Sequence, residues 1–385
     1  MGVILLLLPM LNVGAYKIKE ISARQDIEDA RQGHEYALRL EDRDVLPDIY
    51  YIIFDRYPAA ATLREVYGFD NSRFIDELSR RGFYVASGST ANYLKTEHSL
   101  ASSLNMEYIN HLSDRLGQDF DNWLPLYAML QDYRVWRLLS SKGYRFIHFG
   151  TLYGPTSRNK YADINIKRYS LINEFAVILY KTTVLYPICL KLNVFDPRML
   201  QYKRVIYKFD QLAKIAEIRE PTFVFAHMVT PHSPYVFDRD GSFLRAETAQ
   251  SRELERKYLD QLSFISKEII KLVDALLADQ ENPPVIILQS DEGPYPSRYR
   301  NNVSGFDWRQ ATESELKQKM GILNAYYLPG VNRDSLYSSI TPVNSFRLVF
   351  NLYFNADFKL LPDKNYAFVD IGHPYMFFEI SDKVQ

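Results

Sequence analysis

The sequence predicts an α/β fold with a largely parallel central sheet and helices on both of its faces. Short apolar runs rich in Ile, Val, Phe and Tyr alternate along the chain with longer segments of helical pattern. The run 47–55 is apolar on both faces, which is typical of a central parallel strand, and it ends in a carboxylate. With 385 residues, 47% of them apolar, the chain can bury a large core in one large domain or two ordinary ones.

The first half of the chain has three strand signals separated by helices. Asn71 as N-cap and Gly82 as C-cap bound one helix. A polar turn leads into another helix, because neither Gly nor Pro interrupts the chain between Ser99 and Gly117. The expected elements are strands at 47–55, 83–86 and 144–150, and helices at 71–82, from 99 onward, and over most of 123–142.

The second half continues this alternation of strands and helices. Pro187 and Pro197 break a mainly helical region, since proline removes a backbone donor and clashes with the preceding turn. The expected elements are strands at 222–227, 284–293 and 323–330, and helices within 173–217, at 250–279, within 306–320 and at 344–353.

The N-terminal residues differ from the rest of the chain in composition. Residues 3–16 are strongly apolar but fewer than the roughly 20 residues of a membrane span, and they lack the basic start of a signal peptide. A signal sequence, a short anchor and the end of a truncated transmembrane helix all place the main domain outside the cytoplasm. A buried N-terminal helix is the alternative. The predicted organisation is an anchor or truncated transmembrane segment at 1–16, a charged connecting helix at 17–46, the main domain at 47–366 and a C-terminal tail at 367–385.

Composition limits the partners and the kinds of site. The formal net charge of −1 gives no global field that attracts nucleic acid, so no nucleic-acid partner is expected. The single cysteine excludes an internal disulfide and a zinc site built mainly from cysteine.

Side chains able to bind a metal follow several of the predicted strands. In open α/β sheets, ligands bind beyond the carboxyl ends of the strands. Taken singly, these residues have structural explanations, such as a turn cap, a core histidine or an acidic turn. Together they offer the hard oxygens and imidazoles of a divalent-metal site, where the ion lowers the pKa of a hydroxyl and neutralises an oxyanion. The residues are Asp55, His227, His232, Asp291 and Glu292.

Thr96 is the hydroxyl that the pattern places beside these residues. It falls at or just before the N-terminus of the helix that follows the polar turn. Free backbone N–H groups and the helix dipole favour an anion there. Its hydroxyl either caps the helix or acts as a nucleophile on a phosphate or sulfate held by those N–H groups.

The order and spacing of these residues resemble the alkaline-phosphatase-like superfamily, specifically its sulfatase branch. Asp55 resembles the first metal-binding acid of that branch. Thr96-Glu-His-Ser99 has the spacing of the nucleophile motif, in which Ser stands at plus three. Thr230-Pro-His232 resembles the histidine that faces the substrate, and 291–293 resembles the Asp-His-Gly or Asp-Asn-Gly metal pair. Lipoteichoic acid synthases and phosphoethanolamine transferases carry a threonine at the position of Thr96.

The resemblance implies an alkaline-phosphatase-like sandwich over roughly 47–366 and a specific chemistry. We expect a phosphoester or sulfoester of an envelope lipid or glycan as substrate, attack by Thr96 to give a covalent phosphothreonine, and a membrane-associated, extracytoplasmic domain. His232 is expected to bind the non-bridging oxygens or to protonate the leaving group. The implied ligands of one divalent ion are Asp55, Thr96, Asp291 and Glu292, and the implied substrate-binding residues are Asn92, His227 and His232.

Two residues depart from what the branch usually carries. Glu292 stands where the threonine enzymes usually have His, so Mn²⁺, Mg²⁺ or Ca²⁺ is favoured as the ion, with Zn²⁺ possible. Thr96 argues against hydrolysis of sulfate esters, because formylglycine is made from Cys or Ser. A catalytically inactive, membrane-associated binding or assembly protein of the same fold is the alternative function. An enzyme like the cofactor-independent phosphoglycerate mutases would need two metals and more ligands.

Overall fold

The computed structural model describes residues 46–168, 179–191, 196–218, 220–279 and 281–384. Seven strands form one sheet in the order β2-β7-β6-β1-β5-β3-β4. The pairs among β1, β3, β4, β5 and β6 are parallel, whereas β7 runs antiparallel to both β6 and β2. The predicted α/β fold with a largely parallel sheet is confirmed. The strands are β1 Ile49–Phe54, β2 Tyr84–Val85, β3 Arg145–Phe149, β4 Ile164–Ile166, β5 Thr222–Met228, β6 Val285–Gln289 and β7 Asn324–Tyr327.

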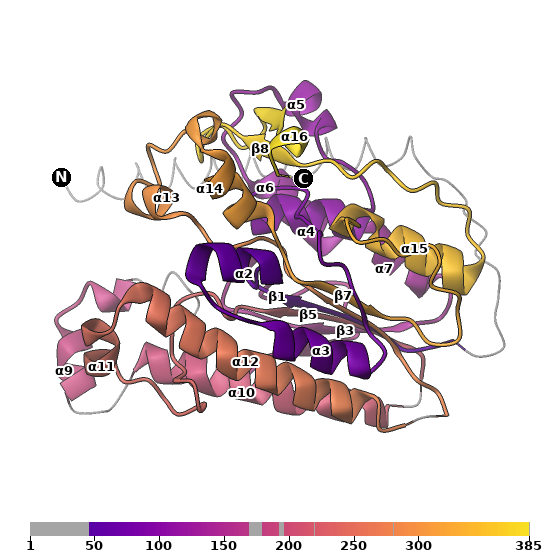
Figure 1. Ribbon diagram of the computed structural model, residues 1–385, viewed down its shortest axis with the longest axis horizontal. Coiled ribbons are helices and arrows are strands. Elements are labelled where there is room, and N and C mark those ends of the chain that lie inside the picture. The colour runs from indigo at the N-terminus through magenta and orange to yellow at the C-terminus, as the bar shows by residue number, and fades with distance from the viewer. Residues whose placement is uncertain (1–45, 169–178, 192–195, 219, 280, 385) are drawn as a thin grey trace, which may run out of the picture.

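Helices cover both faces of this sheet (Figure 1). Alternate side chains of a strand point to opposite faces, so one strand serves two cores. In β1, Ile49, Tyr51 and Ile53 pack under α4, α6, α7 and α15, while the intervening residues face α3, α10 and α12. All six residues of β1 are at most 1% exposed, which explains why the run had to be apolar throughout. The helices are α3 Ser72–Arg80, α4 Thr96–Asn105, α6 Leu124–Gln131, α7 Arg134–Ser140, α10 Pro197–Lys214, α12 Leu254–Leu276 and α15 Pro342–Phe354.

The expected helix over 123–142 is two helices, α6 and α7. The backbone is extended at Asp132 and Tyr133, each with φ −132°, which ends α6 and restarts the chain in a new direction. The Asp132 carboxylate accepts hydrogen bonds from Arg137 Nε and Nη2 at 2.8 and 2.6 Å, which fixes the junction. Neither residue is a proline or glycine, so local composition gave no sign of the break.

The folded domain extends beyond residue 366 to Val384. β8 and β9 form a second, two-stranded antiparallel sheet. Phe368, Ile380 and Val384 are buried in a separate apolar cluster around Trp308. Residues 367–384 are therefore packed against the domain rather than extended from it. The remaining elements are α2 Ala60–Tyr67, α5 His111–Leu116, η1 Gly154–Thr156, α9 Leu185–Lys191, η2 Ile215–Glu217, α11 Ala246–Ser251, α13 Ser297–Asn301, η3 Trp308–Gln310, α14 Glu313–Met320, β8 Tyr366–Phe368, β9 Phe377–Glu379 and α16 Ser381–Val384.

The expected anchor at 1–16 and all but the last residue of the connecting helix at 17–46 lie outside the described residues. Within the described ranges, no helix combines the length and the hydrophobicity that crossing a membrane requires.

Candidate active site

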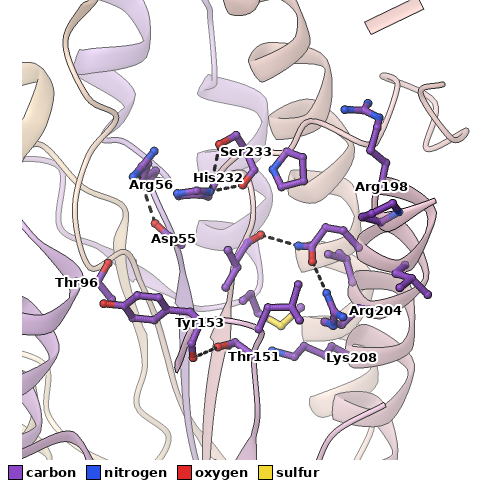
Figure 2. Close-up of a pocket in the computed structure, with 18 of the residues that line it drawn as sticks. Asp55, Arg56, Thr96, Thr151, Tyr153, Arg198, Arg204, Lys208, His232 and Ser233 are labelled. Atoms are coloured by element: carbon purple, nitrogen blue, oxygen red, sulfur yellow. Dashed lines mark hydrogen bonds and ion pairs between the residues drawn. The ribbon is translucent and has the colours of Figure 1, made fainter. Parts of the chain in front are cut away.

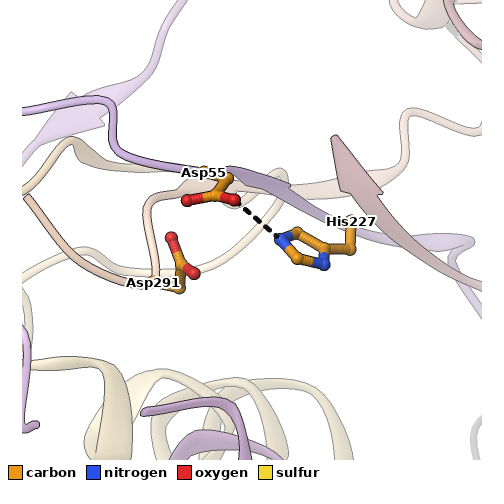
Figure 3. A group of neighbouring side chains, drawn as sticks. All are labelled: Asp55, His227 and Asp291. Atoms are coloured by element: carbon orange, nitrogen blue, oxygen red, sulfur yellow. Dashed lines mark ion pairs between the residues drawn. The ribbon is translucent and has the colours of Figure 1, made fainter. Parts of the chain in front are cut away.

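Three neighbouring strands bring two aspartates and a histidine together. Asp55 directly follows β1, which lies between β5 and β6 in the sheet. Ile53 of β1 is in register with His227 of β5 and with Gln289 at the end of β6, two residues before Asp291. Asp55, His227 and Asp291 therefore meet at the carboxyl edge of the sheet (Figure 3). All three are buried, and each offers a ligand atom within 4.8 Å of the other two.

This cluster, defined as Asp55, His227 and Asp291, fits a divalent cation. Asp55 Oδ1 and His227 Nε2 are buried and have no hydrogen-bond partner among the described residues, which is costly unless a ligand satisfies them. Burial and the charge of Asp291 raise the pKa of Asp55 well above its ordinary value. Burial and the charge of Glu292 raise the pKa of Asp291 to about 6. A cation held between the two carboxylates would relieve this repulsion.

His227 is held so that one ring nitrogen faces Asp55. Its Nδ1 lies 2.9 Å from Thr156 Oγ1, and Thr156 Oγ1 in turn lies 2.9 Å from Thr151 Oγ1. Its Nε2 lies 3.8 Å from Asp55 Oδ2. Burial and the charge of Lys208 hold the pKa of His227 well below its ordinary value, so the imidazole is neutral. A neutral ring fixed through its other nitrogen is the usual form of a histidine ligand.

Thr96 is the first residue of α4, and its hydroxyl faces the cluster. Thr96 Oγ1 donates a hydrogen bond of 2.6 Å to Asp291 Oδ2. The backbone N–H groups of Glu292 and Arg56 donate to the other oxygen of Asp291, at 2.9 and 3.4 Å, which orients this carboxylate. The N-cap of α4 is Lys95, and no side chain caps this helix end. The hydroxyl is therefore directed at the cluster instead of the helix terminus.

Glu292, an expected metal ligand, pairs with two cations. Its Oε1 lies 2.8 Å from Lys319 Nζ and 3.1 Å from Arg56 Nε. Its Oε2 is buried without a hydrogen-bond partner among the described residues. Burial opposes ionisation, but the charges of Lys319 and Arg56 hold the pKa of Glu292 below its ordinary value. Glu292 is not one of the three residues whose ligand atoms converge.

Arg56 and Lys319 were not recognised from the sequence. Arg56 directly follows Asp55, at a positive φ of 64°. Its guanidinium lies 4.4 Å from the centre of the Tyr295 ring, and Lys319 Nζ lies 3.4 Å from the same ring. In the sequence, only the position of Arg56 directly after Asp55 indicates that it belongs to the site. Nothing in the sequence around Lys319 points to Glu292.

The side-chain amide of Asn92 makes two hydrogen bonds with the main chain. Its Nδ2 donates to the carbonyl of Lys364 at 2.9 Å, and its Oδ1 accepts from the N–H of Val343 at 2.9 Å. The residue is 0% exposed and is not among the residues that line the cavity described next. Asn92 therefore stabilises the segment before Thr96 and does not line the cavity.

His232 lies in the loop after β5 and faces the same edge of the sheet. Its backbone N–H donates to the carbonyl of Asp55 at 3.2 Å. Gln261 of α12 holds the loop by donating to the carbonyls of Pro231 and His232 at 3.1 and 3.0 Å. His232 Nδ1 bonds to the carbonyl of Ser233. Burial and the charge of Arg56 hold the pKa of His232 well below its ordinary value.

A cavity of about 320 Å³ opens beside these residues, a size within the range of about 300–1,000 Å³ typical of ligand sites. Asp55, Thr96 and His232 line one end of it (Figure 2). The opposite side is formed by α10, which contributes several cationic side chains. The site therefore has the parts needed to hold an anionic ligand next to a hydroxyl and the cluster of Asp55, His227 and Asp291.

The fold of the chain is the alkaline-phosphatase-like α/β fold that the sequence predicts, and solved structures share it. No family model and no curated protein matches the sequence. Among solved structures, the C-terminal periplasmic domain of EcEptC from Escherichia coli aligns over 90% of this chain and 96% of its own, with 11% identity and a TM-score of 0.55. Its complex with Zn aligns over the same shares with 11% identity and a TM-score of 0.56. The periplasmic domain of phosphoethanolamine transferase EptC from Campylobacter jejuni aligns over 83% of this chain and 92% of its own, with 13% identity and a TM-score of 0.48.

Proposed function

We propose that this chain is a metal-dependent phosphoryl transferase or hydrolase that acts on a phosphoester of an envelope lipid or glycan. The observation that carries the proposal is the 2.6 Å hydrogen bond from Thr96 Oγ1 to Asp291, a member of the buried cluster. A hydroxyl at a helix N-terminus, directed at carboxylates that fit a cation, suits a nucleophile. The fold likeness to a periplasmic domain supports an extracytoplasmic position.

The metal-binding residues in this proposal are Asp55, His227 and Asp291, with Thr96 beside them. His227 takes the place that the family resemblance implies for Glu292. A donor set of two carboxylates and one imidazole suits Zn²⁺ and Mn²⁺ better than an all-carboxylate set does. The Zn complex of the EcEptC domain agrees with this choice. A divalent ion, when bound, lowers the pKa of a neighbouring hydroxyl and neutralises charge on a phosphoryl oxygen.

Each residue of the site has a task in the reaction. Asp291 orients Thr96 Oγ1 and takes its proton as Oγ1 forms a bond to phosphorus. The bond to the leaving oxygen breaks, that oxygen takes a proton from solvent, and the product is a phosphothreonine. The N–H groups at the start of α4 bind the charged oxygens of the phosphoryl group. His232 is neutral and uses Nδ1 on the Ser233 carbonyl, so its Nε2 can accept a proton from the water or sugar hydroxyl that releases the phosphoryl group.

Glu292 in place of histidine is one of the observations that favour the binding-protein alternative. The three residues of the cluster supply metal donors without Glu292, which supports an enzyme.

The test uses the full chain loaded with Zn²⁺ or Mn²⁺ and the chromogenic phosphodiester bis(p-nitrophenyl) phosphate. Thr96→Ala is expected to lower kcat by at least about a thousandfold. Mass spectrometry is expected to detect a phosphoryl adduct in the wild type and none in Thr96→Ala. Thr248→Ala, at an exposed threonine of α11, is the control and keeps full turnover. Full turnover by Thr96→Ala would overturn the mechanism. No turnover by the metal-loaded wild type would favour the binding protein.

A further inference from the structure

One face of α10 lines the cavity opposite Thr96 (Figure 2). Gln201, Arg204, Val205 and Lys208 recur at the three- and four-residue spacing of a single helix face, and all are at most 6% exposed. Arg198 lies near the start of the helix and lines the same cavity. Arg204 and Lys208 are two cations on this buried helix face, which is unfavourable for folding alone, because burial disfavours charge and apolar side chains would pack there at lower cost.

Lys208 has donors left after its structural contact is made. Its ammonium donates to the carbonyl of His227 at 2.8 Å, the only hydrogen bond that it makes with other described residues. An ammonium carries three N–H donors. Within the described part of the chain, no carboxylate forms an ion pair with Lys208, which is 5% exposed. The ammonium can therefore donate to a ligand in the cavity.

Arg198 is positioned by neutral groups, and Arg204 contacts Gln201 on the same helix face. Arg198 Nη2 donates to the carbonyls of Tyr235 and Leu244 at 2.6 and 2.9 Å, while its buried Nε has no hydrogen-bond partner among the described residues. Arg204 Nη1 donates to Gln201 Oε1 at 2.8 Å. The two carbonyl partners hold the Arg198 guanidinium in place without neutralising its charge. Guanidinium groups fixed in this way suit the fork geometry of phosphate recognition.

We propose that Arg198, Arg204 and Lys208, the α10 cationic face, bind a second phosphate group on the same substrate. This inference rests on the proposed function, in which the phosphoryl group that reacts occupies the Thr96 end of the cavity. The cavity reaches both Thr96 and α10, so one ligand can contact both. The substrate is then a lipid headgroup or glycan that carries a phosphate in addition to the phosphoester that is cleaved.

Phosphate binding can be tested without any catalytic step. The full-length Thr96→Ala chain is freed of metal with a chelator and titrated with inorganic phosphate by isothermal calorimetry. Without a metal, the carboxylates of the cluster repel phosphate, so binding reports the α10 cationic face. Lys208→Gln keeps a donor for the His227 carbonyl but removes the charge. It is expected to weaken phosphate binding about tenfold or more, as the loss of a charged hydrogen bond does.

Arg204→Gln is the second variant, and Lys203→Gln on the exposed side of α10 is the matched control. Weaker binding in both buried-face variants, with wild-type affinity in Lys203→Gln, supports the proposal. Equal phosphate affinity in all variants, or no phosphate binding at millimolar concentration by a chain with wild-type circular dichroism, overturns it. The metal content and the phosphothreonine are measured separately, so failure of the proposed function is distinguishable from failure of this inference.

Discussion

Lys319 and Glu292 form an ion pair in the protein interior, with Lys319 Nζ 2.8 Å from Glu292 Oε1 and the two side chains 0% and 2% exposed. Glu292 follows Asp291 directly, so this pair lies next to the cluster of Asp55, His227 and Asp291. Lys319 also donates to the carbonyl of Gly293 at 2.9 Å, which ties α14 to the loop after β6. The pair therefore supports the loop that carries Asp291.

Removing Lys319 should destabilise the fold because it leaves a buried carboxylate with fewer partners. Lys319→Met is expected to lower the free energy of unfolding by about 3 kcal/mol, the low end for breaking a buried pair, since Arg56 still contacts Glu292. Urea unfolding followed by circular dichroism measures the change. The control is Lys364→Met, which breaks an exposed 2.8 Å pair with Glu379 and should cost less than about 1 kcal/mol. Equal losses in the two variants would contradict this account.

The double variant Lys319→Met, Glu292→Gln separates charge from packing. It removes both the ammonium and the carboxylate, so it should recover part of the stability lost in Lys319→Met alone. No recovery would mean that Lys319 acts through its contacts with Gly293 and Tyr295.

Metal content decides between His227 and Glu292 as the third ligand. His227→Gln and Asp291→Asn should each lose the bound ion, because each removes one ligand atom of the cluster. Glu292→Gln should keep the ion, since its Oε1 is engaged by Lys319 and Arg56. Plasma mass spectrometry of the purified full-length variants gives the metal-to-protein ratio. Loss of the ion in Glu292→Gln together with its retention in His227→Gln would restore the assignment made from the sequence pattern.

The sequence was sufficient to place the residues that stand at element ends. Asp55 and Asp291 follow apolar runs that can only be buried strands, so their meeting at one sheet edge could be predicted. Thr96 begins a helix at the position where the polar turn gives way to an uninterrupted helical segment. In each case, local composition marks where the element begins or ends.

The sequence was insufficient where strand register or distant pairing decides the outcome. His227 lies inside β5, where a buried histidine and a metal ligand look alike, and its approach to Asp55 depends on the alignment of β5 with β1. Lys319 lies on a different element from Glu292, and no periodicity links the two residues. The hairpin of β8 and β9 was missed because each strand has only three residues.

Thr156 should influence metal affinity although it is not itself a proposed ligand. Its Oγ1 lies 2.9 Å from His227 Nδ1 and fixes the ring whose other nitrogen faces Asp55. Thr156→Val keeps the shape of the side chain but removes this hydrogen bond. Loss of such a support typically lowers metal affinity about 10–100-fold, and that decrease is expected here. Competition with a chromophoric chelator measures the affinity.

Thr156→Ser, which keeps the hydroxyl, should bind metal nearly as the wild type does, and Thr248→Val controls for the substitution at an exposed site. Wild-type affinity in Thr156→Val would show that packing alone orients His227.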